Sequence, residues 1–197
     1  MGGEAEHATR SANGAFAWDH RWVTQLPPEE RVIRKAQKNR APGRVVCIDL
    51  GDGRCAYGRQ LWSVNAEFYD YVGAIGESVD LLTLVEKPVA FTIWVSNRCF
   101  KRGGRWDLLD TVPLLEHERQ RPDVKFRQDV RGGALSIVSR ACPPSVQFSN
   151  RPATVEECTG IEREAVWDPE HVEDRLRDHF DGLPNKWVES LRARPRH

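Results

Sequence analysis

The segment from Arg44 to Trp62 constrains the fold of this chain more than any other, because it predicts a β-hairpin. Its apolar run, VVCIDL, predicts the first strand. Asp52-Gly53 then predicts a type I′ turn, since both central residues of that turn need a positive φ and this pair tolerates it. Tyr57 lies on the returning strand, where Gly58 marks a position with little room for a side chain.

The pattern after the hairpin predicts an α+β fold, with a central antiparallel β-sheet of hairpins, an N-terminal helix and C-terminal helices. Strands are predicted at residues 67–72, 89–95, 106–109, 124–130 and 134–139. Helices are predicted at residues 27–39, 78–86 and 169–180, with a last short helix around Trp187. We expect residues 115–121 to form a polar connector.

The helix at residues 169–180 has the clearest signals. Asp168 is a favourable N-cap, and Pro169 suits the first helical position. Val172, Leu176 and Phe180 follow at a spacing of four residues, which places them in one apolar stripe. This stripe predicts that the helix packs against the rest of the domain.

The domain organisation is predicted in three parts. Residues 1–15 are polar and are expected to be a disordered tail. Residues 16–42 form an extension that contains the N-terminal helix, and its aromatic residues Trp18 and Trp22 predict packing onto the domain or a partner. Residues 43–192 form the main domain, which is long enough to bury a core without disulfides.

The composition predicts a soluble, cytoplasmic protein. The chain has 29 Lys and Arg against 29 Asp and Glu, so no global attraction to nucleic acid or membrane is implied. No apolar run approaches the ~20 residues of a membrane span, and the first residues lack the pattern of a secretory signal. Five cysteines without a CxxC pair predict buried thiols in a reducing compartment, with a metal site or a reactive thiol as alternatives.

No motif in the sequence predicts a catalytic site, a metal site or a cofactor. The turn Gly51-Asp52-Gly53-Arg54 lacks the Lys-Ser/Thr of a phosphate-binding loop. His171 and His179 share a predicted helix but are two turns apart, which is too far for one metal ion without other ligands. An enzyme with an unrecognised site around Cys158 and His171 stays open as an alternative.

Charge is segregated along the chain. Residues 154–181 contain ten acids and three arginines, whereas residues 21–59 contain nine basic residues and four acids. An acidic surface could bind a partner of opposite charge, although the two segments could also neutralise each other. The candidate contacts with a partner are the acids of the predicted helix and two tryptophans: Glu170, Glu173, Asp174, Asp178, Trp18 and Trp22.

Several short motifs give the chain a family resemblance. They are Gly51-Asp52-Gly53-Arg54 with Tyr57-Gly58-Arg59, Gly104-Arg105-Trp106, Phe126 with Gln128-Asp129, and the blocks Glu157-Cys158-Thr159-Gly160-Ile161-Glu162 and Ala165-Val166-Trp167. Together they resemble immunity protein family 26 of bacterial polymorphic toxin systems. We expect the motif residues Gly51, Asp52, Gly53, Tyr57, Gly58, Trp106, Cys158, Glu162 and Trp167 to be structural.

The resemblance implies a stoichiometric inhibitor and not an enzyme. Such proteins are small, cytoplasmic and encoded beside a secreted toxin, whose C-terminal toxin domain they bind. A nuclease is one candidate toxin, because an enzyme that cleaves nucleic acid carries a basic cleft that an acidic surface could block. The alternative function is a nucleic-acid-binding module that uses the basic segment at residues 31–59.

Overall fold

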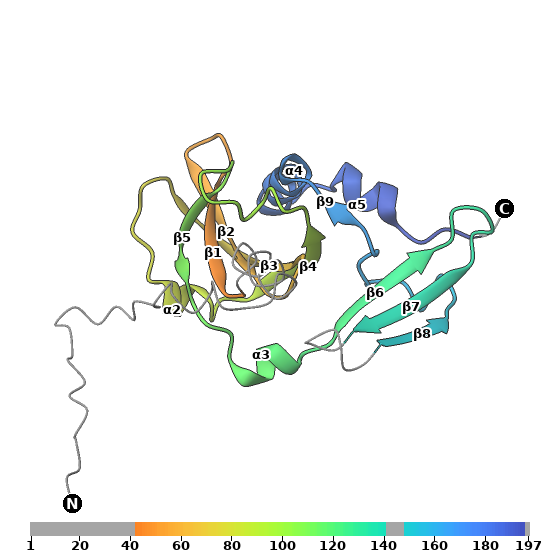
Figure 1. Cartoon of the computed structure of the whole chain (residues 1–197). Helices are drawn as coiled ribbons and strands as arrows, with labels where there is room; N and C mark the ends of the chain where they lie inside the picture. Colours follow the sequence, from red (N-terminus) through yellow and green to blue (C-terminus); the bar gives the residue numbers. More distant parts are fainter. Residues whose placement is uncertain (1–41, 141–147, 196–197) are drawn as a thin grey trace, which may run out of the picture. The chain divides into compact units, whose positions relative to one another are not determined.

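The structure is a computed structural model that describes residues 42–140 and 148–195. Its main element is a six-stranded sheet with the strand order β5-β1-β2-β3-β4-β9 (Figure 1). The strands are β1 (Arg44–Asp49), β2 (Arg54–Gln60), β3 (Asn65–Ala74), β4 (Val89–Val95), β5 (Asp107–Thr111) and β9 (Val166–Trp167). A second sheet has the order β6-β7-β8, with β6 (Asp123–Gln128), β7 (Leu135–Arg140) and β8 (Phe148–Pro152).

The described helices are short except for one. They are α2 (Leu81–Leu84), α3 (Glu116–Gln120), α4 (Pro169–Phe180) and α5 (Lys186–Leu191). The predicted bounds of β4 and α4 are confirmed. The predicted N-terminal helix at residues 27–39 lies outside the described residues, as does the proposed extension up to residue 41.

The α+β prediction is confirmed, but the prediction of a purely antiparallel central sheet is wrong. Strand β9 runs parallel to β4, with Trp94 opposite Val166 and Val95 opposite Trp167, so the sheet is mixed. The sequence did not predict β9 or β8. A two-residue strand has no period of its own to detect, and its pairing depends on a partner that lies about seventy residues earlier in the chain.

The first hairpin is confirmed, while the predicted type I′ turn is wrong. Leu50 N–H donates to Arg54 O at 3.0 Å, so residues 50–53 form a longer loop. Positive φ angles occur at Gly51 (86°) and Gly53 (88°) and not at Asp52, whose carboxylate instead accepts the backbone N–H of Arg54. Two glycines that flank an aspartate therefore make the bend.

The segment predicted as a polar connector contains a helix, α3. The Glu118 carboxylate accepts a 2.7 Å hydrogen bond from the backbone N–H of Leu115, which is the reciprocal half of a capping box. The short helix α2 is better matched to the prediction at residues 78–86, because Asp80 caps it by accepting from Leu82 N and Thr83 N.

The six-stranded sheet separates two apolar clusters. Alternate residues of one strand point to opposite faces, so Val46 and Val45 of β1 belong to different clusters. The larger cluster includes Phe68, Trp106 and the α4 residue Leu176. The smaller cluster packs Tyr57, Tyr69 and Leu84 together on the other face. Helix α4 thus buries the apolar stripe that the sequence predicted.

Candidate functional site

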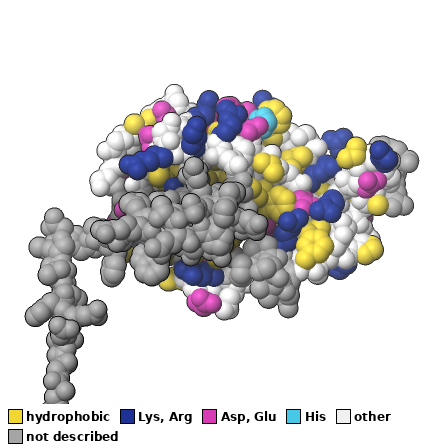
Figure 2. Space-filling model, viewed as in Figure 1, with side chains coloured by type: hydrophobic (Ala, Val, Ile, Leu, Met, Phe, Trp, Pro, Cys, Tyr) yellow, Lys and Arg dark blue, Asp and Glu magenta, His cyan; other side chains and the backbone are white. Residues whose placement is uncertain are grey.

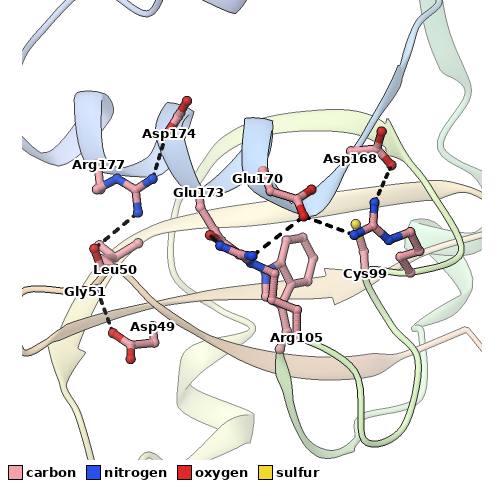
Figure 3. A network of polar contacts seen from close by, with 12 residues as sticks. Asp49, Leu50, Gly51, Cys99, Arg105, Asp168, Glu170, Glu173, Asp174 and Arg177 are labelled. Atoms are coloured by element: carbon pink, nitrogen blue, oxygen red, sulfur yellow. Dashed lines mark hydrogen bonds and ion pairs between the residues drawn. The ribbon is translucent and has the colours of Figure 1, made fainter.

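Helix α4 carries the acids that the sequence nominated for partner binding, and the structure gives each of them an intramolecular contact. Glu173 is the most buried, at 3% exposed. Its carboxylate accepts hydrogen bonds from Arg105 Nε at 2.5 Å, Arg105 Nη2 at 2.7 Å and Trp106 Nε1 at 2.9 Å (Figure 3). Glu173 therefore joins the helix to the loop before β5, and its carboxylate is not available on the surface.

Glu170 lies one turn earlier, where the side chain is partly exposed. It accepts a hydrogen bond from Arg98 Nη2 at 3.0 Å and lies 3.6 Å from Arg105 Nη1 (Figure 3). Arg98 also lies 3.7 Å from the carboxylate of Asp168. The local N–H groups of the helix start and these arginines hold the pKa of Glu170 below its ordinary value.

Asp174 and Asp178 connect α4 to α5. Asp174 accepts hydrogen bonds from Trp187 Nε1 at 3.1 Å and Arg177 Nη2 at 2.6 Å. The Trp187 bond is the largest cause of a pKa below the ordinary value at Asp174. Asp178 accepts from Asn185 Nδ2 at 2.8 Å, and Asn185 in turn caps α5 through Trp187 N and Val188 N. These two acids therefore also support the C-terminal helices.

The acidic surface of α4 is thus balanced by basic side chains of the same chain. Arg98 and Arg105 approach it from the loop before β5, and Arg177 and Lys186 from α4 and α5. On the face shown in Figure 2, acidic and basic side chains lie next to each other. The basic partners of these acids therefore come from residues 98–105 and 177–186 and not from the basic segment at residues 21–59, and Glu170, Asp174 and Asp178 are the partly exposed candidates.

The family motif at the first hairpin has structural contacts. A Cβ on Gly58 would lie 2.8 Å from Phe68 Cε1, so the strand needs glycine where β2 passes the phenylalanine ring. Tyr57 is 2% exposed, and its hydroxyl lies 3.1 Å from Cys55 Sγ. Asp52 holds Arg54 by a side-chain ion pair of 2.5 Å in the loop.

Two of the C-terminal motif residues, Trp167 and Glu162, contact Arg175 of α4. Trp167 of β9 is 3% exposed, and the Arg175 guanidinium lies 5.1 Å from its ring centroid and 3.9 Å from that of Phe91. Glu162 accepts from Arg175 Nη2 at 2.5 Å and so fixes that guanidinium. Burial raises the pKa of the Cys158 thiol, which is 2% exposed. Trp167 and Cys158 are therefore buried and Glu162 holds Arg175 in place, while a structural role for the motif residues stays a prediction.

The basic segment proposed for nucleic-acid binding is partly described, and its described arginines have partners. Arg54 pairs with Asp52 and with Asp181 at 2.9 Å. Arg44 Nη1 donates to Phe100 O at 3.1 Å. Arg59 is 1% exposed. These contacts do not favour a nucleic-acid surface in the described part of this segment, and residues 31–41 lie outside it.

Arg59 belongs to a buried polar cluster that the sequence analysis did not find. Its guanidinium makes a two-pronged contact with Glu118 at 2.8 and 3.2 Å and donates to the backbone oxygens of Val112 and Pro113. Glu67 lies 3.6 Å from it and accepts from Tyr69 Oη at 2.9 Å. No sequence pattern predicted this cluster, because only the fold shows that these side chains face one another.

A cavity of about 530 Å³ lies between β4 and β6, and no sequence pattern predicted it. Its wall includes the rings of Trp62 and Trp94, and Arg140 lies 4.7 Å from the centroid of the Trp94 ring. Trp94 Nε1 donates to Asp123 Oδ2 at 2.6 Å, which ties the two sheets together. Tryptophan and arginine around a cavity are the residue types that dominate binding energy at protein interfaces.

The site suggested for an enzyme, around Cys158 and His171, is not assembled among the described residues. His171 packs against Trp187, with ring centroids 4.0 Å apart and the ring planes tilted by 42°. A cavity of about 430 Å³ lies beside Cys158, but His171 is not among its described lining residues. Within the described ranges, no cluster of three His, Cys, Asp or Glu residues is placed to hold a metal ion.

Two further sequence predictions concern the surface and the membrane. Trp18 and Trp22, the proposed aromatic anchors, lie outside the described residues. None of the described helices has the length and apolar character that crossing a membrane would require.

Comparison with known proteins gives one match. The family model described as Immunity protein 26 matches residues 41–134, which contain strands β1 to β6. This is the family that the sequence motifs resemble. Neither a curated protein nor a solved structure matches the chain.

Proposed function

Because residues 41–134 belong to the immunity protein 26 family, we propose that this chain is an immunity protein that binds and neutralises the toxin domain of a polymorphic toxin system. The family match is the observation that carries the proposal. It implies a toxin as the partner, and a protein that acts by binding and not by catalysis. The proposed mechanism is stoichiometric occlusion of the toxin's active site in the cytoplasm of the producing bacterium.

The described part of the chain supports a rigid binding scaffold. Ion pairs connect segments that are far apart in sequence, such as Arg105 with Glu173 and Arg59 with Glu118. A scaffold that is already ordered before binding loses little conformational entropy in the complex, which favours tight association. Trp94 and Arg140 offer preformed contact groups on its surface.

The partly exposed acids Glu170, Asp174 and Asp178 remain our proposed contacts for a basic toxin, a nuclease being one candidate. The arginines beside Glu170 and Asp174 weaken the electrostatic potential that these two acids present to a toxin. We therefore expect these acids to affect the association rate more than the dissociation rate, as charges at the rim of an interface do.

The first experiment is a pull-down with the tagged chain from the bacterium that encodes it, with mass spectrometry of the bound proteins. We expect one large secreted protein, bound through its C-terminal domain in a 1:1 complex. That domain is then expressed alone and together with this chain in a laboratory bacterium.

Growth arrest by the domain, relieved by co-expression of the chain, is the expected result. A domain that binds but still arrests growth at equal expression would overturn neutralisation. Recovery of nucleic acid, or of many unrelated proteins without an excess of one, would overturn the toxin as partner.

A further inference from the structure

Strand β4 has a neighbour along only part of its outer edge. Strand β9 pairs with Trp94 and Val95, while no described strand lies beside residues 89–93 on the side away from β3 (Figure 1). Val95 N–H donates to Val64 O, on the β3 side. Since backbone groups alternate in direction along a strand, Thr92 presents its N–H and C=O to the opposite side, where none of the described strands pairs with it.

Strand β6 has a similar open edge. Phe126 N–H donates to Glu162 O at 2.9 Å, and Phe126 O accepts from Glu164 N–H at 2.7 Å, on the side away from β7. Val124 lies two residues earlier and so presents its backbone groups in the same direction. Within the described ranges, no strand pairs with Val124 on this side.

The 530 Å³ cavity lies where these two edges are uncovered. It is lined by Thr92 of β4, by Val124 of β6, and at one end by the segment Gly160–Glu162. We call this cavity the β4-edge groove. Its backbone walls resemble those that bind an extended peptide as an additional strand.

The chain's own residues 162–167 already occupy the neighbouring part of both edges. Arg163 bridges Phe126 in parallel, and Val166–Trp167 then pairs in parallel with β4. Upstream of Glu162 the chain leaves the edges, and Gly160 has a positive φ of 80°. The groove therefore continues a path along which an extended segment is already held by backbone hydrogen bonds.

The side chains around the groove favour a peptide over a charged small ligand. The charged residues on its wall have partners: Lys125 binds Asp123 at 2.6 Å, Arg121 binds Glu67 at 2.8 Å, and Arg140 binds Glu164. The Arg140 guanidinium also lies 5.6 Å from the ring centroid of Phe148, which is 59% exposed. The surface thus offers flat rings, paired charges and free backbone groups.

One wall residue also has unused hydrogen-bonding capacity. Asn65 is only 9% exposed, and its Oδ1 has no hydrogen-bond partner among the residues that the structure describes. A buried acceptor without a donor costs about 1–3 kcal/mol, which an incoming amide N–H can offset if the wall adjusts. Peptide amides are donors of this kind.

We infer that the β4-edge groove binds an extended segment of the partner protein, which adds to β4 as a further strand at Thr92. The inference rests on the proposed function only for which protein supplies the segment, a toxin.

The test uses a phage-displayed library of random twelve-residue peptides, selected on the full chain. Bound peptides are then measured against Thr92→Pro, which removes the outward N–H, and against Thr111→Pro as the matched control. Thr111 lies on β5, at the opposite edge of the same sheet, and its N–H bonds only to Asp110 Oδ1 among the described residues. Proline is tolerated on edge strands where the N–H faces away from the sheet.

We expect Thr92→Pro to weaken peptide binding about tenfold or more, because it removes a backbone hydrogen bond and blocks close approach. Thr111→Pro should change it less than about twofold. If Thr92→Pro does not fold, amide hydrogen exchange of the unmodified chain replaces it, and bound peptide should protect the N–H groups of Thr92 and Val124.

Three results would overturn the inference. The library yields no peptide, or its peptides bind without protecting Thr92, or the free chain is a dimer that Thr92→Pro converts to a monomer. The last result would make a second copy of the chain the occupant. None of these results affects the pull-down. Failure of the groove to bind peptide can therefore be distinguished from failure of the chain to bind a toxin.

Discussion

Trp106 Nε1 donates a 2.9 Å hydrogen bond to Glu173 Oε1, and both side chains are buried although 67 residues separate them. The bond joins the start of β5 to the middle of α4. It explains why a helix with a strongly acidic sequence packs its second turn against the sheet: the buried carboxylate has three donors, from Trp106 and Arg105.

This contact predicts that Glu173 contributes to stability and not only to charge. Glu173→Ala should lower the free energy of unfolding by about 2–4 kcal/mol, because it leaves a buried indole N–H without an acceptor. Glu170→Ala, one turn away at a partly exposed position, is the control and should lower stability by less than about 1 kcal/mol. Urea unfolding followed by circular dichroism measures both. Equal effects of the two substitutions would show that Glu173 has no special role.

We expect a steric limit on side-chain size at position 58 of the first hairpin. Gly58→Ala would bring a Cβ within 2.8 Å of Phe68 Cε1, so the core must shift at a cost of about 1–3 kcal/mol. Phe68→Leu removes the clashing ring edge. The double variant should therefore be more stable than the sum of the two single effects predicts. Additive effects in the double-mutant cycle would contradict the contact.

Glu118 predicts a change in stability at acidic pH. Burial opposes its ionisation, but the Leu115 N–H bond and the Arg59 guanidinium outweigh this and hold its pKa below the ordinary value. A carboxyl group whose pKa is lowered by folding stabilises the folded state. This contribution is fully present above the unfolded pKa of about 4.3, and it is lost as the pH falls through the pKa of the folded state.

Glu118→Gln should therefore be less stable than the parent at pH 7, by about 1–3 kcal/mol. The difference should shrink as the pH is lowered below about 4.3. Thermal unfolding from pH 7 to pH 2.5 measures it, with Glu116→Gln on the exposed side of α3 as the control. A difference that stays constant over this range would rule out the Arg59 pair as its source.

We expect the buried cysteines to react slowly with alkylating reagents in the folded chain. Burial raises the pKa of the Cys47 and Cys99 thiols to about 12, so little thiolate exists at pH 8. Iodoacetamide labelling at pH 8, located by mass spectrometry, should modify these positions much faster in urea than in the native protein. The experiment uses the Cys142→Ala variant, because Cys142 lies outside the described residues and its labelling would complicate the comparison. Rapid native labelling of Cys99 would contradict its burial.

Partner binding should depend on salt if the acids of α4 steer it. The association rate of the recovered toxin domain should fall as ionic strength rises, because exposed charges are screened. The triple variant Glu170→Gln, Asp174→Asn and Asp178→Asn should associate several-fold more slowly and show a flatter salt dependence, with the dissociation rate less affected. Surface plasmon resonance measures both rates. An unchanged association rate would remove these acids from the interface.

The sequence by itself determined the local elements whose signals lie within a few residues. Asp168-Pro169 and the stripe of Val172, Leu176 and Phe180 predicted α4, and the β-branched run at residues 89–95 predicted β4. The hairpin between β1 and β2 was clear for the same reason. The short motifs also pointed to the immunity protein 26 family, whose model matches residues 41–134 and so covers the motifs up to Asp129 but not the blocks at residues 157–167.

Only the tertiary structure decided how these elements meet. It showed that Glu173 is buried while Glu170 is exposed, although both are acids on one helix. It paired β9 with β4, enclosed Arg59 beside Glu118, and placed no other strand of residues 42–140 and 148–195 beside Thr92 at the edge of β4. These features depend on contacts between residues far apart in the chain. A local pattern of residue types carries no information about which distant side chain supplies the partner.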